Sequence, residues 1–390
     1  MLNMLRKSLS LEVDNFLNFL KIKSTNTFTK SAFVQARMKI KPEIFKHLSD
    51  SLINEFYTDN DSAIKKWNGF RLLAVDGSRI TLPVTKELTK LYGEAKNQTS
   101  TGVVQARCSV LYDVENNYVL DGKLAPLEQG ERKLALSHLQ HCETGDLIIY
   151  DRGYPSYSFI YDHIANNIDY LMRVKISFNQ LTIDFEKSKK QTKILDIYPG
   201  KNTKLTDKPY GKTTPIKVRL VRVELPKGQV EILITSLIDL KNYSSQIFKE
   251  LYQKRWGVET FYDELKNKLK VEHFSGYSNQ SILQDFYAAL LVSNIQTLIV
   301  SELEEEIMER NKSKKYNYKI NTNLSYGFLK NRILELFFTK NSMDIVIDEI
   351  KKLFIEHQVP IRPNRSFLRK SGKYRARIKP KITKNQKDAI

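Results

Sequence analysis

Three patterns of apolar and polar residues follow one another along the chain. Residues 1–68 show helical spacing in VDNFLNFLKI and in SAFVQARMKIKPEIFKHLSDSLINEFY, with Thr27 and Ser31 in the place of helix caps. From residue 69 the apolar runs become short and end in polar turns, as in FRLLAVDGS and DLIIYDRGY, which is typical of buried strands. The pattern predicts a small helical domain at 1–68 and a strand-containing domain after it.

Strands and helices alternate between residues 69 and 175. Three strands, carried by FRLLAVDGS and ARCSVLYDVENNYVLDGKLAPL, precede the helix ERKLALSHLQHC, and the strand DLIIYDRGY follows. The helix YPSYSFIYDHIANN and the strand DYLMRVK complete the order β-β-β-α-β-α-β. A mixed sheet covered by helices adopts this order, so we predict an α/β (α+β) domain.

The segment 176–240 departs from this alternation. Prolines interrupt runs such as IKVRLVRVEL and VEILITSLI, and Pro226-Lys227-Gly228 predicts a hairpin turn between them. We interpret 176–240 as an all-β insertion into the α/β domain.

Helical periodicity returns after the insertion. It covers 241–310, which we assign to the α/β domain together with 69–175. The segment 311–390 contains a weaker helix, SMDIVIDEIKKLFIEH, and ends in a basic tail. The long apolar stretch YAALLVSNIQTLIVS is too short and too polar to span a membrane, and we predict a core helix there.

Net charge is the property of the composition that says most about the partner of this protein. The chain has 63 Lys and Arg against 44 Asp and Glu, a formal net charge of +19. Nucleic acid is the first partner that such a balance suggests. The last 29 residues, from Arg362, hold eleven Lys and Arg and one Asp, so this tail either binds phosphates without sequence preference or only keeps the chain soluble.

The N-terminal helices also carry basic residues. In FTKSAFVQARMKIKPEIFKHL, Lys30, Arg37, Lys39 and Lys41 lie close together in the sequence. A helix-turn-helix-like reader of DNA and a plain helical bundle both fit this segment.

Cysteine usage excludes two classes of small protein. Only Cys108 and Cys142 occur, so the chain has no disulfide framework and no paired CxxC zinc site. His138, His141 and Cys142 share one predicted helix, but their spacing fits no standard metal site and we expect ordinary packing or exposure. With no signal-peptide block at the start, a cytoplasmic protein is expected.

Two carboxylates mark the ends of predicted strands. Asp76 follows the apolar run 72–75, and Asp151 follows the run 147–150. Strand ends are where α/β folds place ligands. Asp and Gly are also ordinary turn residues, so each motif taken alone favours a structural turn over a site.

A third candidate group lies in LYQKRWGVETFYDELKNKL, residues 251–269, which predicts one helix. At 100° per residue its Tyr252, Arg255, Glu259 and Lys266 fall within roughly 60° of one another. An adjoining apolar stripe would anchor this helix; it consists of Val258, Phe261, Leu265 and Leu269. The alternative is a solvated face with an ordinary Arg255–Glu259 surface pair.

Three acids beside basic groups suggest phosphoryl transfer on nucleic acid with two Mg²⁺ ions, since oxygen ligands suit this metal. With VDGS and YDRGY, the spacing Tyr252-x2-Arg255-x3-Glu259-x6-Lys266 resembles that of bacterial cut-and-paste insertion-sequence transposases. These enzymes carry an Asp-Asp-Glu (DDE) triad and a Tyr-Arg-Glu-Lys signature.

The resemblance implies a ribonuclease H-like fold with a β-rich insertion before the Glu-bearing helix. It implies that two Mg²⁺ ions, which Mn²⁺ can replace, are held by the catalytic acids Asp76, Asp151 and Glu259. Phosphates of double-stranded DNA, at the element ends and the target, would be held by Tyr252, Arg255 and Lys266. The expected activity is cleavage of the element ends and joining of their 3′-hydroxyls to the target, by a homodimer in the synaptic complex.

Two further residues near these motifs leave alternatives open. Arg152 either reaches a phosphate or forms a structural salt bridge. Trp256 either stacks on an unpaired base or packs in the core, and we favour the core. Two other functions also fit the chain: a metal-dependent nuclease or resolvase on the same fold, and a non-catalytic DNA-binding descendant of a transposase.

Overall fold

The computed structural model describes residues 2, 9–21, 28–59, 63–97, 100–201, 203–225, 228–338 and 342–362. The chain forms two compact units, which we call the sheet unit and the helical unit. The sheet unit comprises 60–79 and 107–262, and the helical unit comprises 1–59, 80–106 and 263–390. The basic tail from residue 363 and Thr27 lie outside the described residues.

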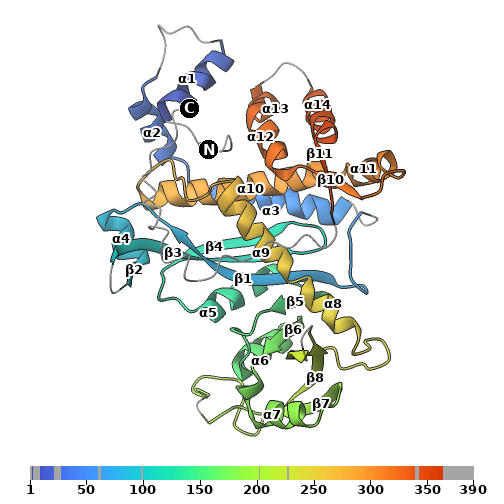
Figure 1. Cartoon of the computed structure of the whole chain (residues 1–390). Helices are drawn as coiled ribbons and strands as arrows, with labels where there is room; N and C mark the ends of the chain where they lie inside the picture. Colours follow the sequence, from blue (N-terminus) through green and yellow to red (C-terminus); the bar gives the residue numbers. More distant parts are fainter. Residues whose placement is uncertain are drawn as a thin grey trace. The chain divides into compact units, whose positions relative to one another are not determined.

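The sheet unit is built on one mixed sheet (Figure 1). Its strands are hydrogen-bonded in the order β3-β1-β5-β6-β9-β8-β7, and β4 pairs with β3. The strands are β1 (Arg71–Thr81), β3 (Ser100–Asp113), β4 (Val119–Ala125), β5 (Asp146–Tyr150), β6 (Asp169–Val174), β7 (Thr192–Ile197), β8 (Ile216–Glu224) and β9 (Val230–Thr235). β1, β5 and β6 are parallel, whereas β9, β8 and β7 are antiparallel.

Helices cover both faces of this sheet (Figure 1). They are α5 (Glu131–Leu136), α6 (Tyr157–Ala165), α7 (Gln180–Lys187), α8 (Ile247–Gln253) and α9 (Trp256–Asp263), with short 3₁₀ turns η2 (Leu139–His141) and η3 (Ile176–Phe178). On β5, Ile149 packs with Phe248 of α8, whereas Tyr150 packs with Phe159 of α6. Because side chains alternate along a strand, these neighbours lie on opposite faces. The predicted mixed sheet with flanking helices is confirmed.

The segment 176–240 differs from its prediction as an all-β insertion. It contains α7, whose N-terminus is closed by a capping box between Asn179 and Thr182. Its strands do not form a separate sheet either, because β9 pairs with β6 and extends the main sheet. Of the predicted turn, Pro226 and Lys227 lie outside the described residues, and Gly228 has a positive φ of 74°.

The helical unit is centred on α10 (Asn279–Ser301). Its other elements are α1 (Leu9–Phe19), α2 (Lys30–Met38), α3 (Glu43–Asp59), α4 (Lys86–Tyr92), β2 (Glu94–Asn97), the π-helical turn η5 (Glu264–Lys268), α11 (Glu304–Arg310), β10 (Tyr318–Ile320), α12 (Thr322–Arg332), α13 (Glu335–Phe338), α14 (Met343–Glu356) and β11 (Gln358–Pro360). α10 is long and apolar enough to cross a membrane, yet 72% of its most apolar window is buried within the structure, as in a core helix.

The N-terminal helices do not form the separate 1–68 domain that the sequence predicts, because α3 packs directly on α10. Phe45 lies in one apolar cluster with Ala288 and Leu291, and the Asn294 side chain donates to Ser49 Oγ at 2.8 Å. These contacts place residues 1–59 in one compact unit with 263–390.

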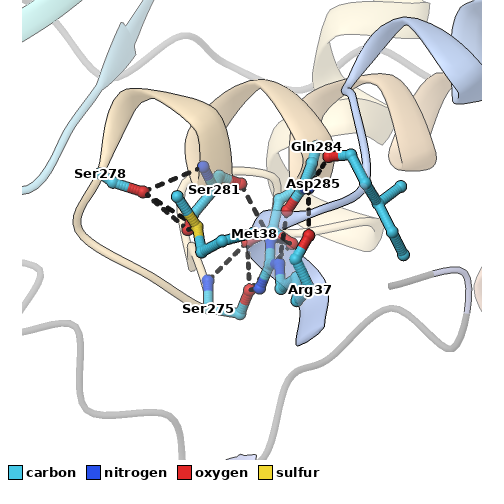
Figure 2. Close-up of polar contacts among 8 residues, drawn as sticks. Arg37, Met38, Ser275, Ser278, Ser281, Gln284 and Asp285 are labelled. Atoms are coloured by element: carbon cyan, nitrogen blue, oxygen red, sulfur yellow. Dashed lines mark hydrogen bonds and ion pairs between the residues drawn. The ribbon is translucent and has the colours of Figure 1, made fainter. Parts of the chain in front are cut away.

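Arg37 does not belong to an exposed basic face of α2. It is 3% exposed and forms an ion pair of 2.9 Å with Asp285 of α10 (Figure 2). Its guanidinium also donates to Gln284 Oε1 at 2.6 Å, to the Ser281 carbonyl at 3.0 Å and to Ser275 Oγ. Arg37 therefore joins α2 to α10.

The predicted caps of α2 also differ from the structure. Thr29 is the N-cap residue, since its hydroxyl accepts a hydrogen bond from the Ala32 N–H at 3.1 Å. Ser31 lies inside the first turn of the helix.

Candidate active site

The register of two parallel strands places Asp76 and Asp151 side by side. Ala74 of β1 pairs with Ile149 of β5. Two residues further along lie Asp76, within β1, and Asp151, directly after β5. Because side chains alternate with a period of two, both carboxylates lie on the face where Leu72 and Ile149 pack against α8.

The segment 251–269 is not the single helix that the sequence predicts. α8 ends at Gln253, and a tight turn separates it from α9. In this turn the N–H groups of Arg255 and Gly257 bond to carbonyls three residues back, at 3.2 and 3.0 Å, as in a 3₁₀ turn. The π-helical turn η5 then follows α9. A constant 100° per residue therefore does not describe the faces of this segment.

α9 is fixed to the sheet next to Asp76. The Tyr262 hydroxyl donates to the Asp76 carbonyl at 2.9 Å, and Phe261 stacks on Tyr112 with ring centroids 5.2 Å apart. A Cβ atom at Gly257 would stand only 3.3 Å from Val114 Cγ1, so the missing side chain allows α9 to approach β3 closely. Glu259, two residues later, is held on the side of the sheet that carries the aspartates.

The predicted apolar stripe is buried as expected. Val258, Phe261, Leu265 and Leu269 all lie in the core.

Arg255 connects the three acids. Its side chain is 8% exposed, donates to Glu259 Oε1 at 2.7 Å and lies 3.9 Å from Asp76 Oδ2. Burial raises the pKa of Asp151, and the Arg152 backbone N–H and the charge of Arg173 lower it. The charge of Arg255 adds a smaller lowering. Arg255–Glu259 is therefore not a solvated surface pair: the Arg255 guanidinium contacts Glu259 and Asp76, and its charge also acts on Asp151.

The pKa values of the two aspartates shift in opposite directions. Burial, with smaller contributions from Glu259 and Asp151, raises the pKa of Asp76 to about 6 despite the opposing Gly77 N–H and Arg255. Burial acts on Asp151 too, but the Arg152 backbone N–H and the guanidiniums of Arg173 and Arg255 outweigh it and lower its pKa. Burial therefore favours the protonated form of Asp76, whereas its basic neighbours keep Asp151 ionised.

Two charged residues of this site were missed by the sequence analysis. Arg173 of β6 donates to Asp151 Oδ1 at 2.8 Å and also pairs with Glu231 of β9. β6 pairs Leu171 with Ile149, so Arg173 lies on the face of Asp151. The period-two alternation in DYLMRVK could have identified it.

Tyr252 also contacts an acid. Its ring is buried, and its hydroxyl donates to Asp151 Oδ1 at 3.4 Å. Tyr252 and Arg255 are both directed at carboxylates in this structure, whereas their predicted role is to hold phosphates.

The remaining predicted residues lie in different surroundings. The Arg152 side chain is exposed, and no ion pair holds it to another described residue. Trp256 is 47% exposed, so the core packing that we favoured is wrong, and its ring lies 5.6 Å from the Arg255 guanidinium carbon. Lys266 lies in η5, in the helical unit.

The His138 segment is a packing feature, as expected. His138 is buried and hydrogen-bonded to Ser109 Oγ at 2.9 Å and to Asp121 Oδ2 at 2.8 Å. Burial lowers the pKa of His138 and raises that of Cys142. Both groups are therefore uncharged at neutral pH.

The donor set of this site suits a hard divalent cation. Among the described residues the site has four carboxylates, Asp76, Asp151, Glu231 and Glu259, against the two guanidiniums of Arg173 and Arg255. Oxygen ligands and this excess negative charge fit Mg²⁺. In this structure, however, no three His, Cys, Asp or Glu side chains of the described residues are close enough together to hold an ion. The Arg255 guanidinium lies between Asp76 and Glu259.

Comparisons with known proteins identify the family of this chain. Residues 67–295 match the family described as transposase DDE domain. The chain is 20% identical over 283 residues to transposase InsG for insertion sequence element IS4 of Escherichia coli (strain K12). This alignment covers 71% of the chain and 62% of the length of that relative.

A solved structure was also found, a cryo-EM structure of the piggyBac transposase synaptic complex with hairpin DNA. The match has 10% identity and a TM-score of 0.37, and it covers 73% of this chain and 57% of that one; such a likeness is too low to support an inference. The family match spans more than half of the chain and includes all three acids. The chain belongs to the transposase DDE domain family.

Proposed function

We propose that this protein is a DNA transposase that cuts the ends of an insertion sequence and joins their 3′-hydroxyls to target DNA. Its catalytic acids are Asp76, Asp151 and Glu259. The observation that supports this most is their arrangement around Arg255, with Glu259 at 2.7 Å and Asp76 at 3.9 Å. A structural ion pair would need one carboxylate here, and the chain supplies three.

Asp76, Asp151 and Glu259 would hold two Mg²⁺ ions, which Mn²⁺ can replace. When bound, the ions stabilise the charge on the attacking and leaving oxygens of phosphoryl transfer. The protein's own contribution is to aim the carboxylates. Tyr252 and Arg173 donate to Asp151 and keep it oriented, and Arg255 does the same for Glu259.

Two displacements at phosphorus account for the activity. In the first, the oxygen of water attacks a phosphodiester at the element end, and the 3′-oxygen leaves and takes up a proton. In the second, this 3′-hydroxyl attacks a target phosphodiester, so that one P–O bond forms as another breaks. Arg152, with its exposed side chain, and Lys266 are proposed to contact DNA phosphates, and a homodimer would pair the two ends.

Single-turnover cleavage of a duplex that carries the element's end tests this proposal. The parent protein should cut it with Mg²⁺, and Asp151→Asn should bind it equally well without cutting. A pre-cut end offered with target DNA should then be joined. Cleavage without joining would instead identify a nuclease or resolvase. An Asp151→Asn variant that cuts like the parent would exclude this residue as a catalytic acid.

A further inference from the structure

One part of the sheet unit carries a concentration of positive charge that the proposed active site does not use. Residues 187–217 contain nine lysines and two aspartates, and no arginine or glutamate. The nine lysines are Lys187, Lys189, Lys190, Lys193, Lys201, Lys204, Lys208, Lys212 and Lys217. All nine are exposed, and none forms an ion pair with another described residue.

The lysines come from neighbouring parts of the fold. One is the last residue of α7, two follow this helix, one lies in β7, four lie in the loop between β7 and β8, and one lies at the start of β8. β7 pairs with β8 along the whole length of β7, from Thr192 opposite Val221 to Ile197 opposite Ile216. α7, β7 and β8 are drawn together in Figure 1. The largest group, Lys201, Lys204, Lys208 and Lys212, therefore lies in the single loop between β7 and β8.

The loop between β7 and β8 is held in place by three tyrosines. Tyr157 of α6 donates to the Thr214 carbonyl at 2.8 Å, and Tyr210 of the loop donates to Ser158 Oγ at 2.7 Å. The ring centroid of Tyr210 lies 5.0 Å from that of Tyr157 and 4.6 Å from that of Tyr161. An anchored loop loses less conformational entropy on binding than a free one, so its lysines are prepared for a ligand.

Protection of a sheet edge explains only a small part of this charge. Lysines on an edge strand prevent pairing with other chains, and β7 is such a strand. Only Lys193 lies in β7, however, whereas Lys201, Lys204, Lys208 and Lys212 belong to the loop. Repulsion among these four lysines destabilises the folded protein. Nearby carboxylates would reduce this repulsion, and a bound anionic ligand would reduce it as well.

The residue type identifies the kind of contact. Lysine is a point charge with a flexible stem, whereas arginine forms the paired hydrogen bonds that read guanine edges. A surface of lysines without exposed arginine therefore fits the sugar–phosphate backbone and not a base sequence. We propose that the loop lysines Lys201, Lys204, Lys208 and Lys212 bind the phosphates of double-stranded DNA, independently of sequence. This proposal rests on the proposed function only in naming DNA as the polyanion.

Salt dependence tests this proposal. Four loop lysines are changed together, in a Lys201→Gln, Lys204→Gln, Lys208→Gln, Lys212→Gln variant, and duplex affinity is measured against salt concentration. Each lost phosphate contact should reduce the slope of log affinity against log salt by about 0.9. We expect a total reduction of about 2 to 4, and the same reduction for a duplex with the element's end and for a random-sequence duplex.

A charge-matched control separates this surface from net charge. It changes four exposed lysines elsewhere, Lys66, Lys241, Lys249 and Lys319, to Gln. An equal change of slope in the control, or no change in the loop variant, would overturn the proposal. So would a loss confined to the element-end duplex. Circular dichroism and the unfolding midpoint confirm that each variant is folded.

A second variant tests the anchored loop while keeping every lysine. Tyr210→Phe removes the hydrogen bond to Ser158, and random-sequence affinity should fall by a few-fold. An unchanged affinity would show that the anchor does not contribute. Binding is measured without cleavage, so these results are independent of the Asp151→Asn experiment: a parent that binds the duplex but never cuts it would contradict only the proposed function.

Discussion

Two buried arginines of this protein show how a structural ion pair differs from a candidate reaction site. Arg37 meets one carboxylate, Asp285, and each of its three nitrogens has a hydrogen-bond partner. Arg255 meets two carboxylates within 3.9 Å and a third through its charge, and its Nε has no partner. A satisfied network fixes one arrangement of helices, whereas an excess of acids around one base leaves charge for a ligand to neutralise.

The largest difference between the two sites should be in activity. Asp151→Asn should reduce single-turnover cleavage by more than about ten-thousandfold, equivalent to roughly 5 kcal/mol of transition-state stabilisation. Asp285→Asn, the matched change beside Arg37, should leave the cleavage rate of the folded protein unchanged. Equal losses in the two variants would remove the distinction between the sites.

The second-largest effect should be on folding stability, and here the Arg37 site should be the more sensitive of the two. Arg37→Ala leaves Asp285, whose side chain is only 14% exposed, without its charge partner and should cost about 3–5 kcal/mol in the free energy of unfolding. Arg255→Ala should cost less, because the side chains of Glu259 and Asp76 remain 34% and 24% exposed to water. Urea unfolding of both variants measures the difference, and a larger loss for Arg255→Ala would contradict it.

A pH-dependent effect should follow from Asp76. Its folded pKa of about 6 exceeds the ordinary 3.8, so between these values the folded protein holds a proton that the unfolded chain has released. Folding stability therefore falls as the pH rises from about 4 to about 6, by at most about 3 kcal/mol. Asp76→Asn should abolish this fall. The unfolding free energies of both proteins are compared with a chelator present, and parallel pH profiles would be the contradicting result.

The smallest effect should come from Gln280, which bonds to the backbone next to Arg37. Gln280 donates to the carbonyls of Met38 and Ile40 at 2.6 and 2.9 Å. Gln280→Ala should cost about 1 kcal/mol in the free energy of unfolding, since water can replace part of these bonds. DNA cleavage should be unaffected, and a loss of activity with full stability would show that the network does more than join two helices.

The strands of the sheet were predicted well because each strand is marked by a short run of neighbouring apolar residues. Short apolar runs that end in Asp76 and Asp151 identified two strands, and the helices between them followed from their spacing. The register that aligns the two aspartates is a property of strand pairing, which no single run contains. Arg173 and Glu231 join the site through the same pairing. Alternation along DYLMRVK could have singled out Arg173, but its partners Asp151 and Glu231 became visible only in the structure.

The helix with Glu259 was predicted less well, for a physical reason. Helical spacing identifies a helix but not a tight turn within it, and Lys254 and Arg255 are both compatible with a continuous helix. The N-terminal helices show the same limit. Nothing in the spacing around Arg37 distinguishes a residue that meets DNA from one that pairs with Asp285, almost 250 positions away.

The close approach at Gly257 has a consequence for judging related genes. A Cβ atom at this position would stand 3.3 Å from Val114, so a bulky residue there is expected to shift α9 and Glu259 while every acid of the triad remained in the sequence. Such a copy would keep all three acids and is expected to be less active. Whether a copy of such an element can move is therefore decided partly by a position that has no chemistry of its own.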